Sequence, residues 1–594
     1  MGFLKGKGKR KLIMIKRLSF RRFSGIVLLS FLAAASAGAA EVVQQARIVA
    51  SNAEIQDRFG EVIAISGDTM VVGAAYEASG ASGVNGDQHD NSTGLAGAAY
   101  VYVRDGATWR QQAYLKASTP GYKVFGWSVA ISGDIIVVGA PSERSATTGV
   151  NGDETHGDLP YAGAAYVFVR HGTNWTQEAY LKASNTAREQ QFGRTVAVSG
   201  NTVVVGAPME SSGGESSGAV YVFVRTGTTW SQQAYLKAPT VEPNDVFGIS
   251  LAISGDTLVV GASGDDSGAS EVNGNQNDNS LEFAGAAHVF VRSGNTWAHQ
   301  SYLKASNAGR YDSFGNAVAV SGDTIVVGAW GEYSNATGVN GNQSDDSFGA
   351  AGAAYVFVRS GTSWSQQAYL KASNTGERDT FGQAVAVYGN VIVVGAPSEQ
   401  SNATGVNGDQ TNDSSTGAGA AYVFVREGTD WQQVAYLKPW NADGDARFPI
   451  NYVFGGAVAA SADEVAAGAY GARNHTGAVY TFGLSGVVPA DGDGDGIPDK
   501  EDQCPGSAAG EIVDAKGCSI EQMVPCHGRW RNHGHYVRAL KNVSSDFAAA
   551  GLITRAQQRA ILRAGAQANC GKRRWQVARP APPAREPVRR GLGR

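Results

Sequence analysis

Short apolar stretches separated by polar or glycine-containing turns fill most of the chain. Ala317 to Ser321 and Thr324 to Gly328 flank a Gly-Asp pair, which suits a tight hairpin with positive φ. Ala353 to Arg359 and Trp364 to Lys371 flank Ser-Gly-Thr-Ser in the same way. The second and third of these segments are apolar without interruption at their centres, which predicts strands covered on both faces of a sheet. The pattern therefore predicts a unit of four short strands.

This unit recurs seven times, and each copy begins with Phe-Gly. The phenylalanines are Phe59, Phe125, Phe192, Phe247, Phe314, Phe381 and Phe454, at spacings of 66, 67, 55, 67, 67 and 73 residues. Four-stranded sheets that repeat and pack on each other through both faces are the blades of a β-propeller. We expect glycine and alanine where the sheets crowd the central axis.

The two ends of the repeat region complement each other. The seventh copy stops at Gly477-Ala-Val-Tyr-Thr-Phe and has no fourth strand. Gln44-Gln-Ala-Arg-Ile-Val-Ala-Ser, near the amino terminus, matches the fourth strand Gln366-Gln-Ala-Tyr-Leu-Lys-Ala-Ser of a full copy. Pairing this strand into the last blade would remove two exposed sheet edges. The fold class is thus predicted as all-β, with a seven-bladed propeller over residues 41–486 that the N-terminal strand closes.

The repeat resembles a known family. Phe125-Gly precedes Gly139-Ala-Pro, and Phe192-Gly and Phe381-Gly precede the same tripeptide. This pattern, over residues 42 to about 484, is similar to the FG-GAP repeat, which builds the integrin α-subunit head and many secreted bacterial propellers. The resemblance implies a propeller with an extracellular interaction role and implies no reaction. In integrin-like members calcium lies in an Asp-rich loop between the first two strands. Here that loop is only Ser-Gly-Asp or Ser-Gly-Asn, too short for five or six oxygen ligands, so those sites are not carried over.

The loops that differ between copies are expected on one face of the disc. Turns between strands one and two, and between three and four, are nearly constant, whereas the second-to-third loops and the inter-blade connections vary. Five second-to-third loops contain a Val-Asn-Gly insert, which forms a small turn by itself. An alternative is a weak cation or glycan site, and its candidate residues are Asp87, Asp90, Asp153, Asp409 and Asp413.

Basic residues recur near the fourth strands. They are Lys116, Lys182, Lys237, Lys304, Lys371 and Lys438, together with the arginine before each turn between strands three and four. An anion groove is one interpretation. Because the residues repeat regularly around the ring, we expect solvated strand positions instead.

Composition and charge exclude several classes of protein. Gly 78 without a Gly-X-Y period excludes collagen, and 43% apolar residues exclude a chain that is disordered throughout. No apolar run reaches the roughly 18 residues of a membrane span. Residues 1–40 contain nine basic residues, no acid, and a short apolar stretch before Ala37-Gly-Ala, which predicts a signal peptide. Residues 41–522 hold 25 basic and 51 acidic residues, so we expect no nucleic-acid partner.

A calcium site is predicted after the propeller, in residues 489–521. Oxygen donors of Asp491, Asp493, Asp495, Asp499 and Asp502, with the backbone carbonyl of Ile497, have the spacing that a hard cation of six to eight ligands requires. Nearby prolines argue against the helices of an EF-hand. With Gln503-Cys-Pro and Asp514-Ala-Lys-Gly-Cys, the segment resembles a thrombospondin type 3 repeat, which implies Ca²⁺ in a structural role.

All four cysteines lie near the carboxyl end, at Cys504, Cys518, Cys526 and Cys570, and their even number in an exported chain predicts two disulfides. Residues 522–572 show helical periodicity at Tyr536, Leu540, Val543 and Phe547, and Thr554 with Gln557 fits a capping box, so a helical hairpin bracketed by Cys526 and Cys570 is expected. A zinc site at His527, His533 and His535 is the less favoured alternative. Residues 573–594 are expected to be a basic, disordered tail.

The predicted function is a secreted or cell-surface interaction or adhesion protein without catalytic activity. Its expected partner is an extracellular protein or glycan, and we expect a monomer. One alternative is a polysaccharide-binding or matrix protein. A propeller hydrolase is less favoured because no nucleophile motif or cluster of metal-ligating histidines is recognisable in residues 41–486.

Overall fold

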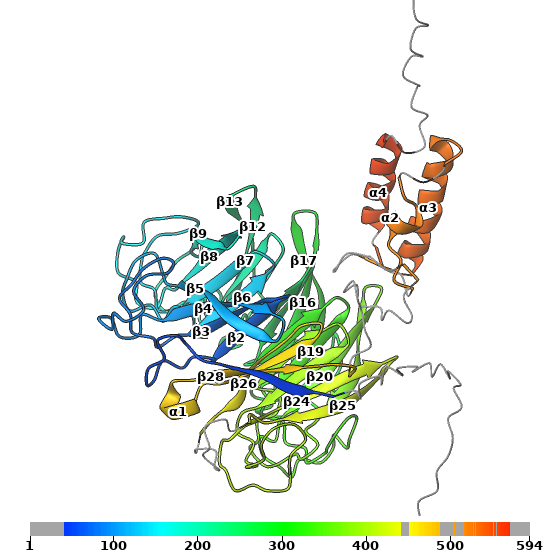
Figure 1. Ribbon diagram of the computed structural model, residues 1–594. Coiled ribbons are helices and arrows are strands. Elements are labelled where there is room, and N and C mark those ends of the chain that lie inside the picture. Colours follow the sequence, from blue (N-terminus) through cyan, green and yellow to red (C-terminus); the bar gives the residue numbers. More distant parts are fainter. Residues whose placement is uncertain are drawn as a thin grey trace, which may run out of the picture. The chain divides into compact units, whose positions relative to one another are not determined.

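The computed structural model describes residues 41–440, 451–487, 503–504, 512–513, 516–526, 528, 530–550, 552–553, 555–568 and 570. Its main body consists of seven antiparallel sheets of four strands each, arranged around a central axis (Figure 1). The predicted signal peptide in residues 1–40, the calcium ligands in residues 491–502 and the tail in residues 573–594 lie outside the described residues. The prediction of a seven-bladed propeller is confirmed.

The first four blades follow the chain in order. Blade 1 contains β2 (Val62–Ser66), β3 (Thr69–Ala74), β4 (Ala98–Asp105) and β5 (Thr108–Leu115). Blade 2 contains β6 (Ser128–Ser132), β7 (Ile135–Ala140), β8 (Ala164–His171) and β9 (Asn174–Leu181). Blade 3 contains β10 (Thr195–Ser199), β11 (Thr202–Ala207), β12 (Ala219–Thr226) and β13 (Thr229–Leu236). Blade 4 contains β14 (Ser250–Ser254), β15 (Thr257–Ala262), β16 (Ala286–Ser293) and β17 (Thr296–Leu303).

The remaining blades have the same order of strands. Blade 5 contains β18 (Ala317–Ser321), β19 (Thr324–Ala329), β20 (Ala353–Ser360) and β21 (Ser363–Leu370). Blade 6 contains β22 (Ala384–Tyr388), β23 (Val391–Ala396), β24 (Ala420–Glu427) and β25 (Asp430–Leu437). Blade 7 contains β26 (Phe454–Ala460), β27 (Glu464–Ala469), β28 (Ala478–Gly483) and β1 (Val43–Ile48), with the short helix α1 (Ala472–His475) between β27 and β28. The strands of blade 5 differ from the predicted bounds by one residue at most.

The ring is closed by β1, as the sequence predicts. This strand pairs antiparallel with β28, so that Gln44 lies opposite Phe482 and Ile48 lies opposite Val479. In Figure 1 the blue strand β1 runs beside yellow elements from the far end of the propeller. The seventh blade therefore joins the start and the end of the repeat region, and its outer edge is covered.

Apolar side chains fill the space between neighbouring blades. Each phenylalanine of the Phe-Gly pairs is fully buried, and Phe314 makes an edge-to-face contact with Tyr355 at a ring-centroid distance of 5.4 Å. The second strands are buried along their whole length, for example Thr324–Ala329. Burial on both faces explains why these strands show continuous apolar runs and no alternation.

Glycine is required where the innermost strands meet. A Cβ added to Gly328 would lie 1.9 Å from the carbonyl oxygen of Gly382 in the next blade, and Gly261 meets Gly315 in the same way. Such distances are far inside van der Waals contact, so a larger residue would push the blades apart. The expectation of small residues near the axis is confirmed.

The two faces of the disc carry different connections. In blades 1 to 6, two-residue turns join strands one and two, and strands three and four, on what we call the turn face; in blade 5, for example, Ser321 pairs with Thr324 and Ser360 pairs with Ser363. The second-to-third loops and the inter-blade connections lie on the opposite face, which we call the loop face. Because strands alternate in direction, every innermost strand begins at the loop face.

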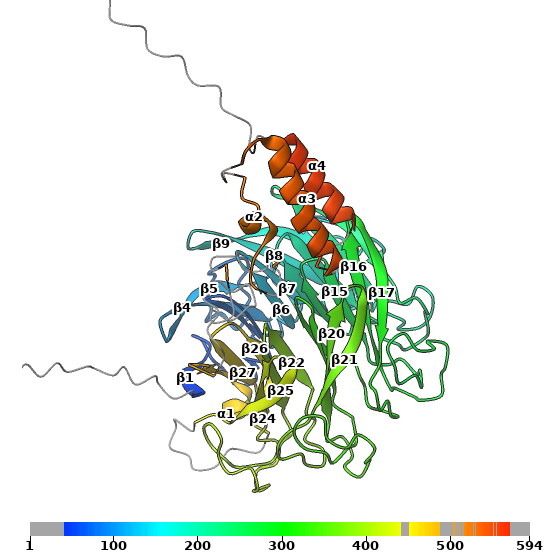
Figure 2. The same ribbon diagram turned by 90° about the vertical axis from the view of Figure 1, so that its right-hand side faces the viewer.

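The described residues of the carboxyl-terminal region form three helices, α2 (Ile520–Met523), α3 (His533–Ala549) and α4 (Arg555–Gln567). Helices α3 and α4 pack side by side (Figure 2), and Tyr536, Leu540 and Phe547 are buried as expected for one helical face. The N-terminal cap of α3 is Asn532, whose side chain accepts a hydrogen bond from the His535 amide. Thr554, half of the expected capping box, lies outside the described residues. The predicted helical hairpin is observed.

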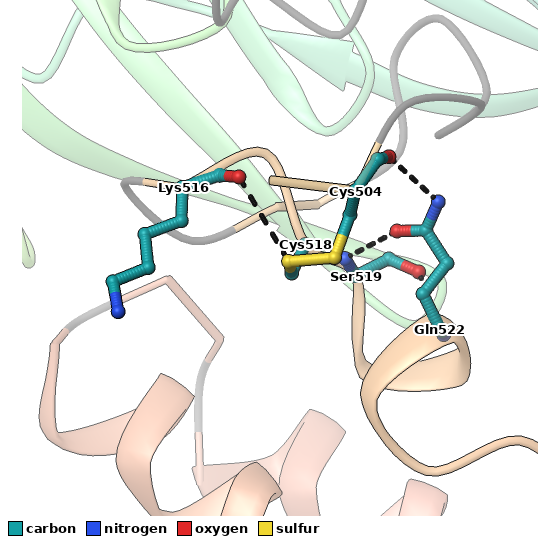
Figure 3. Close-up of a disulfide and its surroundings, with 5 residues drawn as sticks. All are labelled: Cys504, Lys516, Cys518, Ser519 and Gln522. Carbon is teal, nitrogen blue, oxygen red and sulfur yellow. Dashed lines mark hydrogen bonds between the residues drawn. A yellow bond between two sulfur atoms is a disulfide. The ribbon is translucent and has the colours of Figure 1, made fainter. Parts of the chain in front are cut away.

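Both expected disulfides are present, between Cys526 and Cys570 and between Cys504 and Cys518. Figure 3 shows the second one beside Gln522, whose side chain donates a 3.0 Å hydrogen bond to the Cys504 carbonyl and accepts one from the Ser519 amide. The capping box of α2 thus tethers the disulfide to the helix. Because these bonds persist in oxidising compartments, they agree with an extracellular protein.

Candidate functional site

The Val-Asn-Gly inserts extend the outermost strands at the loop face. In blade 1, the side chain of Asn85 accepts a 2.9 Å hydrogen bond from the Tyr114 amide, and Lys116 donates its amide to the Gly83 carbonyl. Asn340 and Asn407 repeat the contact in blades 5 and 6. Asparagine tolerates the positive φ of 57° found at Asn85. The inserts are therefore small ordered turns that lie against the end of each fourth strand.

The candidate aspartates of these loops are distributed over three blades: Asp87 and Asp90 lie in blade 1, Asp153 in blade 2, and Asp409 and Asp413 in blade 6. Asp87, Asp90, Asp153 and Asp409 each accept a hydrogen bond from a backbone amide two residues later. Asp413 is different, because it lines a pocket of about 350 Å³ together with Arg378 and the buried Asp379. The structure thus brings the five candidates to one face but into no common site.

Five of the six recurring lysines are buried and Lys237 is only partly exposed, so the expectation of solvated positions is wrong. Lys371 is fully buried and donates a 2.8 Å hydrogen bond to Glu332, which is 1% exposed. Five other blades contain an equivalent pair, namely Lys116–Glu77, Lys182–Glu143, Lys237–Glu210, Lys304–Asp265 and Lys438–Glu399. Burial lowers the pKa of Lys371, while the Glu332 carboxylate partly restores it. Solvation was expected because the acid partner lies in a loop far from the lysine in sequence.

Each pair belongs to a wider polar network beneath the loop face. In blade 5, Tyr369 and the side-chain amide of Asn307 both donate to Glu332, at 2.7 and 3.0 Å. Asn307 also accepts a 2.6 Å hydrogen bond from Tyr355. These residues come from an inter-blade connection, a second-to-third loop and two strands, so the network fixes the variable segments to the rigid blade.

Four blades place a second carboxyl group beside this network. Asp57, Asp245, Asp312 and Asp379 occupy the position two residues before the Phe-Gly phenylalanine and are nearly fully buried. The pKa of Asp379 is raised to about 7, mainly by burial and also by Glu399 and Asp413, although the hydrogen bond from the Gly376 amide lowers it. The other three carboxyl groups also have a pKa raised to about 7, with burial as the main cause. Near neutral pH these sites take up protons.

The other three blades show a different residue at this position. Blade 2 has Lys123, and there Lys182 and Lys123 together lower the pKa of Glu143 although burial alone would raise it. Blade 3 has Gln190, whose side chain accepts a 3.0 Å hydrogen bond from the Ala187 amide as Asp379 does from Gly376. Blade 7 has Tyr452. The charge and the hydrogen bonds of the network beneath the loop face therefore differ from blade to blade.

The arginines before the third-to-fourth turns are held in place and do not form an anion groove. Arg359 donates to Asp323 at 2.6 Å, and its guanidinium lies over Trp364 at 5.2 Å from the ring centroid. The same contacts recur in blades 2 and 4. These side chains are only partly exposed, so the expectation of freely solvated positions is wrong for them as well.

At the centre of the loop face lies a cavity of about 260 Å³, lined by the first residues of all seven innermost strands. Around it lies a ring of equivalent positions, each two residues after a Phe-Gly phenylalanine, which we call the channel-mouth ring. Its members are Glu61, Trp127, Arg194, Ile249, Asn316, Gln383 and Gly456. Glu61, Ile249, Asn316 and Gly456 of this ring line the cavity, whereas Trp127, Arg194 and Gln383 are not among its lining residues. No two members of the ring are the same residue. The neighbouring Phe-Gly pairs are identical, so the blades cease to be interchangeable at this ring.

One side of the ring carries an aromatic and charged cluster. Arg58 forms an ion pair with Glu61 at 3.2 Å. The guanidinium of Arg58 lies over the Tyr76 ring at 4.3 Å and over the Tyr470 ring at 5.6 Å from the centroids. Burial raises the pKa of Glu61, and Arg58 opposes this effect. The Arg58 charge is thus compensated by Glu61 and covered by two tyrosines.

Arg194 stacks on Trp127, with 4.5 Å between the guanidinium carbon and the indole centroid. Within the part of the chain that the structure describes, no hydrogen bond or ion pair holds the Arg194 side chain. Burial lowers its pKa, and the carboxylate of Glu61 counteracts this from longer range. Arg194 is thus a partly exposed cation on an aromatic support.

Exposed aromatic residues continue outward from this cluster. Tyr122 and Tyr161 are each 43% exposed, and burial together with the adjacent Tyr161 hydroxyl raises the pKa of Tyr122. In blade 4, Phe283 stacks on Tyr311 at 6.0 Å between ring centroids. Tyr161 and Phe283 adopt φ of 56° and 52°, a strained conformation for bulky residues, where blade 6 has Gly417. Leu95, Ser216 and Ala350 adopt the same positive φ at the equivalent position of blades 1, 3 and 5, so this conformation is a feature of the repeat, and Tyr161 and Phe283 are the positions where it presents an aromatic ring.

Sequence reasoning missed the channel-mouth ring because it sought known motifs and treated the blades as nearly interchangeable. The available signal was the spread of residue types at one position of an otherwise constant repeat. Among the described residues, no three His, Cys, Asp or Glu side chains are grouped to hold a metal ion. Of the zinc candidates, His527 lies outside the described residues, and both ring nitrogens of His533 face carbonyl oxygens, of Cys570 and Ala566. None of the helices in the described ranges is long and apolar enough to cross a membrane.

Comparison with known proteins identifies the family of the repeat region. The FG-GAP repeat model matches residues 42–102, 109–168, 175–223, 230–290, 297–357 and 364–424, which together are more than half of the chain. Each match begins with a fourth strand and ends in the third strand of the next blade, so β1 is read as part of a repeat. No curated protein sequence matches the chain.

Two solved structures illustrate how distant the structural likenesses are. The crystal structure of the Mitotic Checkpoint Complex includes a chain with 12% identity and a TM-score of 0.39, covering 79% of this chain and 98% of that one. A structure of S. cerevisiae Dbp5 bound to Nup159, Gle1, IP6 and ADP gives 11% identity and a TM-score of 0.33, covering 74% and 94%. TM-scores this low support no argument. On the strength of its six matched segments and seven blades, the chain belongs to the FG-GAP repeat family.

Proposed function

We propose that this protein is an extracellular, non-catalytic interaction protein that binds its ligand with the loop face of the propeller. The observation that carries the proposal is the contrast between the faces. Short, nearly constant turns form one face, while the other gathers the variable loops, the exposed aromatic residues and the channel-mouth ring. Variable loops on a rigid scaffold are the usual place of recognition. The buried lysine–carboxylate networks support it, because they hold these loops in a fixed shape before a ligand arrives.

The proposal is tested by binding of the purified full chain to extracellular surface material. Replacing Tyr122 and Tyr161 by serine should abolish binding, because it removes two exposed aromatic faces from the loop face. Replacing Asp105 and Glu427 by serine on the turn face should leave it unchanged. Equal binding by both variants would contradict the assignment of the loop face. Turnover of an extracellular polymer that one loop substitution abolishes would contradict a non-catalytic role.

Calcium binding by residues 491–502 is a separate part of the proposal. Its support is the spacing of the oxygen donors, which suits a hard cation. Substitution of Asp493 and Asp495 by alanine should lower calcium uptake in calorimetry without changing the melting of the propeller. Exchange of Asp546 for alanine, in α3, is the matched control. Undiminished uptake by the double variant would refute the calcium site.

A signal peptide in residues 1–40 completes the proposal, since the disulfides and the family agree with an exported protein. Amino-terminal sequencing of the protein recovered from the culture medium tests it. A mature chain that begins near residue 41 is expected, and an uncleaved intracellular chain would contradict export.

A further inference from the structure

Among the residues that the structure describes at the channel mouth, one cation has no hydrogen-bonded or ion-paired partner. Arg58 is compensated by Glu61 at 3.2 Å, whereas the Arg194 guanidinium has no hydrogen-bonded or ion-paired partner among the described residues. Nearly every other arginine and lysine discussed above is paired with an acid. A guanidinium supported on one face by an indole keeps its edge available for two parallel hydrogen bonds to a carboxylate. The chemistry at this point therefore favours a carboxylate ligand.

The surroundings of Arg194 favour a sugar over a peptide. Tyr122 and Tyr161 offer aromatic faces with hydroxyl groups at their edges, and Asn316 and Gln383 offer side-chain amides on the other side of the ring. Apolar faces next to polar tips suit sugar rings, which have an apolar side and many hydroxyl groups. An extended peptide is usually bound by an unpaired strand edge. The loop-face end of the channel is lined by the starts of innermost strands and presents no such edge.

The size of the cavity limits what enters it. At about 260 Å³ it is slightly smaller than the roughly 300–1,000 Å³ typical of small-molecule sites. It is large enough for at most one unit of a larger molecule. Arg194 and Trp127 are not among its lining residues, so they would contact such a molecule beside the cavity, and the aromatic residues further out would contact the units that follow.

We propose that the channel mouth binds a carboxylate-bearing sugar unit of an acidic extracellular polysaccharide, with Arg194 on Trp127 receiving the carboxylate. This inference rests on the proposed function, since it assigns a ligand class to the same loop face. It goes further by naming the contact that selects the ligand.

The overall charge of the chain predicts an unusual salt dependence. Residues 41–522 contain 51 acidic and 25 basic residues, so the body repels a polyanion at long range. Selectivity must come from the direct contact at Arg194. Affinity should therefore stay constant or rise as NaCl is added, because salt screens the repulsion more than the short contact. A basic polyanion-binding groove would show the opposite trend.

The test is isothermal titration calorimetry of the full chain with oligogalacturonate, oligomannuronate and hyaluronan fragments, and with methyl-esterified oligogalacturonate as the uncharged counterpart. We expect at least one free acid to bind and its esterified or reduced form to bind roughly 10-fold or more weakly, the effect of losing a charged hydrogen bond. Arg194→Gln should cause a similar loss. Arg144→Gln, which removes an exposed loop-face arginine paired with Asp158, is the matched control and should change the affinity less than about twofold.

Other outcomes separate failure of the inference from failure of the proposed function. Binding of none of the three acids overturns the inference, as does uronate binding that Arg194→Gln leaves unchanged. Arg194-dependent binding of poly-glutamate without uronate binding replaces the sugar by an acidic peptide and also overturns it. In each case the proposed function stands if the Tyr122 and Tyr161 substitutions still abolish binding to surface material. Trp127→Phe should remove the ligand-induced change in fluorescence, and unchanged melting of each variant shows that it is folded.

Discussion

Lys371 and Glu332 form an ion pair of 2.8 Å in which neither side chain is more than 1% exposed. Six blades contain a lysine–carboxylate pair at these two positions. The seventh has Val49 at the lysine position and Ala472 at the acid position, so both partners are absent together. The pair links the end of a fourth strand to the second-to-third loop of its own blade. It therefore ties the shape of the loop face to the rigid part of the propeller.

Breaking one pair should be costly. Lys371→Met leaves Glu332 as a buried charge without its cation, which typically costs about 3–5 kcal/mol. The same substitution at Lys237, whose side chain is 16% exposed, should cost less because water can reach the remaining carboxylate. Denaturant unfolding of both variants measures the difference. Equal, small losses of stability would show that the pairs do not hold the loops.

Protonation of the buried aspartates gives a pH dependence with a definite sign. The pKa of Asp379 is raised from 3.8 to about 7 in the folded protein, so the protonated form is favoured by folding. The resulting contribution to stability is fully present below about pH 4 and is lost as pH rises through 7. Asp379→Asn keeps the hydrogen-bond acceptor, as Gln190 does in blade 3, and should make the protein more stable than wild type at pH 8. Thermal melting at pH 5 and pH 8 tests this, and a variant less stable at pH 8 would contradict the raised pKa.

Close contact at the axis makes one glycine irreplaceable. Gly328→Ala would place a methyl group 1.9 Å from the Gly382 carbonyl oxygen, so the two blades would have to separate. Overpacking of this kind costs about 1–3 kcal/mol or more. Gly94→Ala is the control, because nothing lies within 4 Å of its added Cβ. A melting temperature that falls equally for both variants would argue against the packing of the innermost strands.

The sequence predicts the architecture well because the same pattern of strands and turns occurs seven times along the chain. Strand bounds in blade 5, the closing strand β1 and the glycines at the axis all follow from residues that recur at fixed spacing. The burial of Lys371 and its ion pair were harder to predict from the sequence, because its partner Glu332 lies 39 residues away, on the other side of a loop. The joint replacement by Val49 and Ala472 in blade 7 was a readable signal of their contact.

The channel-mouth ring was predictable only in part. Its position, two residues after each phenylalanine, is visible in the repeat, and its diversity of residue types marks it as special. That Arg194 stacks on Trp127 while Arg58 pairs with Glu61 depends on which blades are neighbours and on how side chains turn at the rim. These side-chain contacts depend on packing among residues that are far apart in the sequence, so the local spacing of residues does not predict them.

The most direct test of recognition at the loop face is hydrogen–deuterium exchange of the full chain with and without bound oligogalacturonate. We predict slower exchange in peptides that contain Arg58 to Glu61, Trp127 and Arg194, with no change in the turn-face hairpins around Gly322 and Gly361. Protection of the turn face, or binding without protection at the channel mouth, would contradict the account.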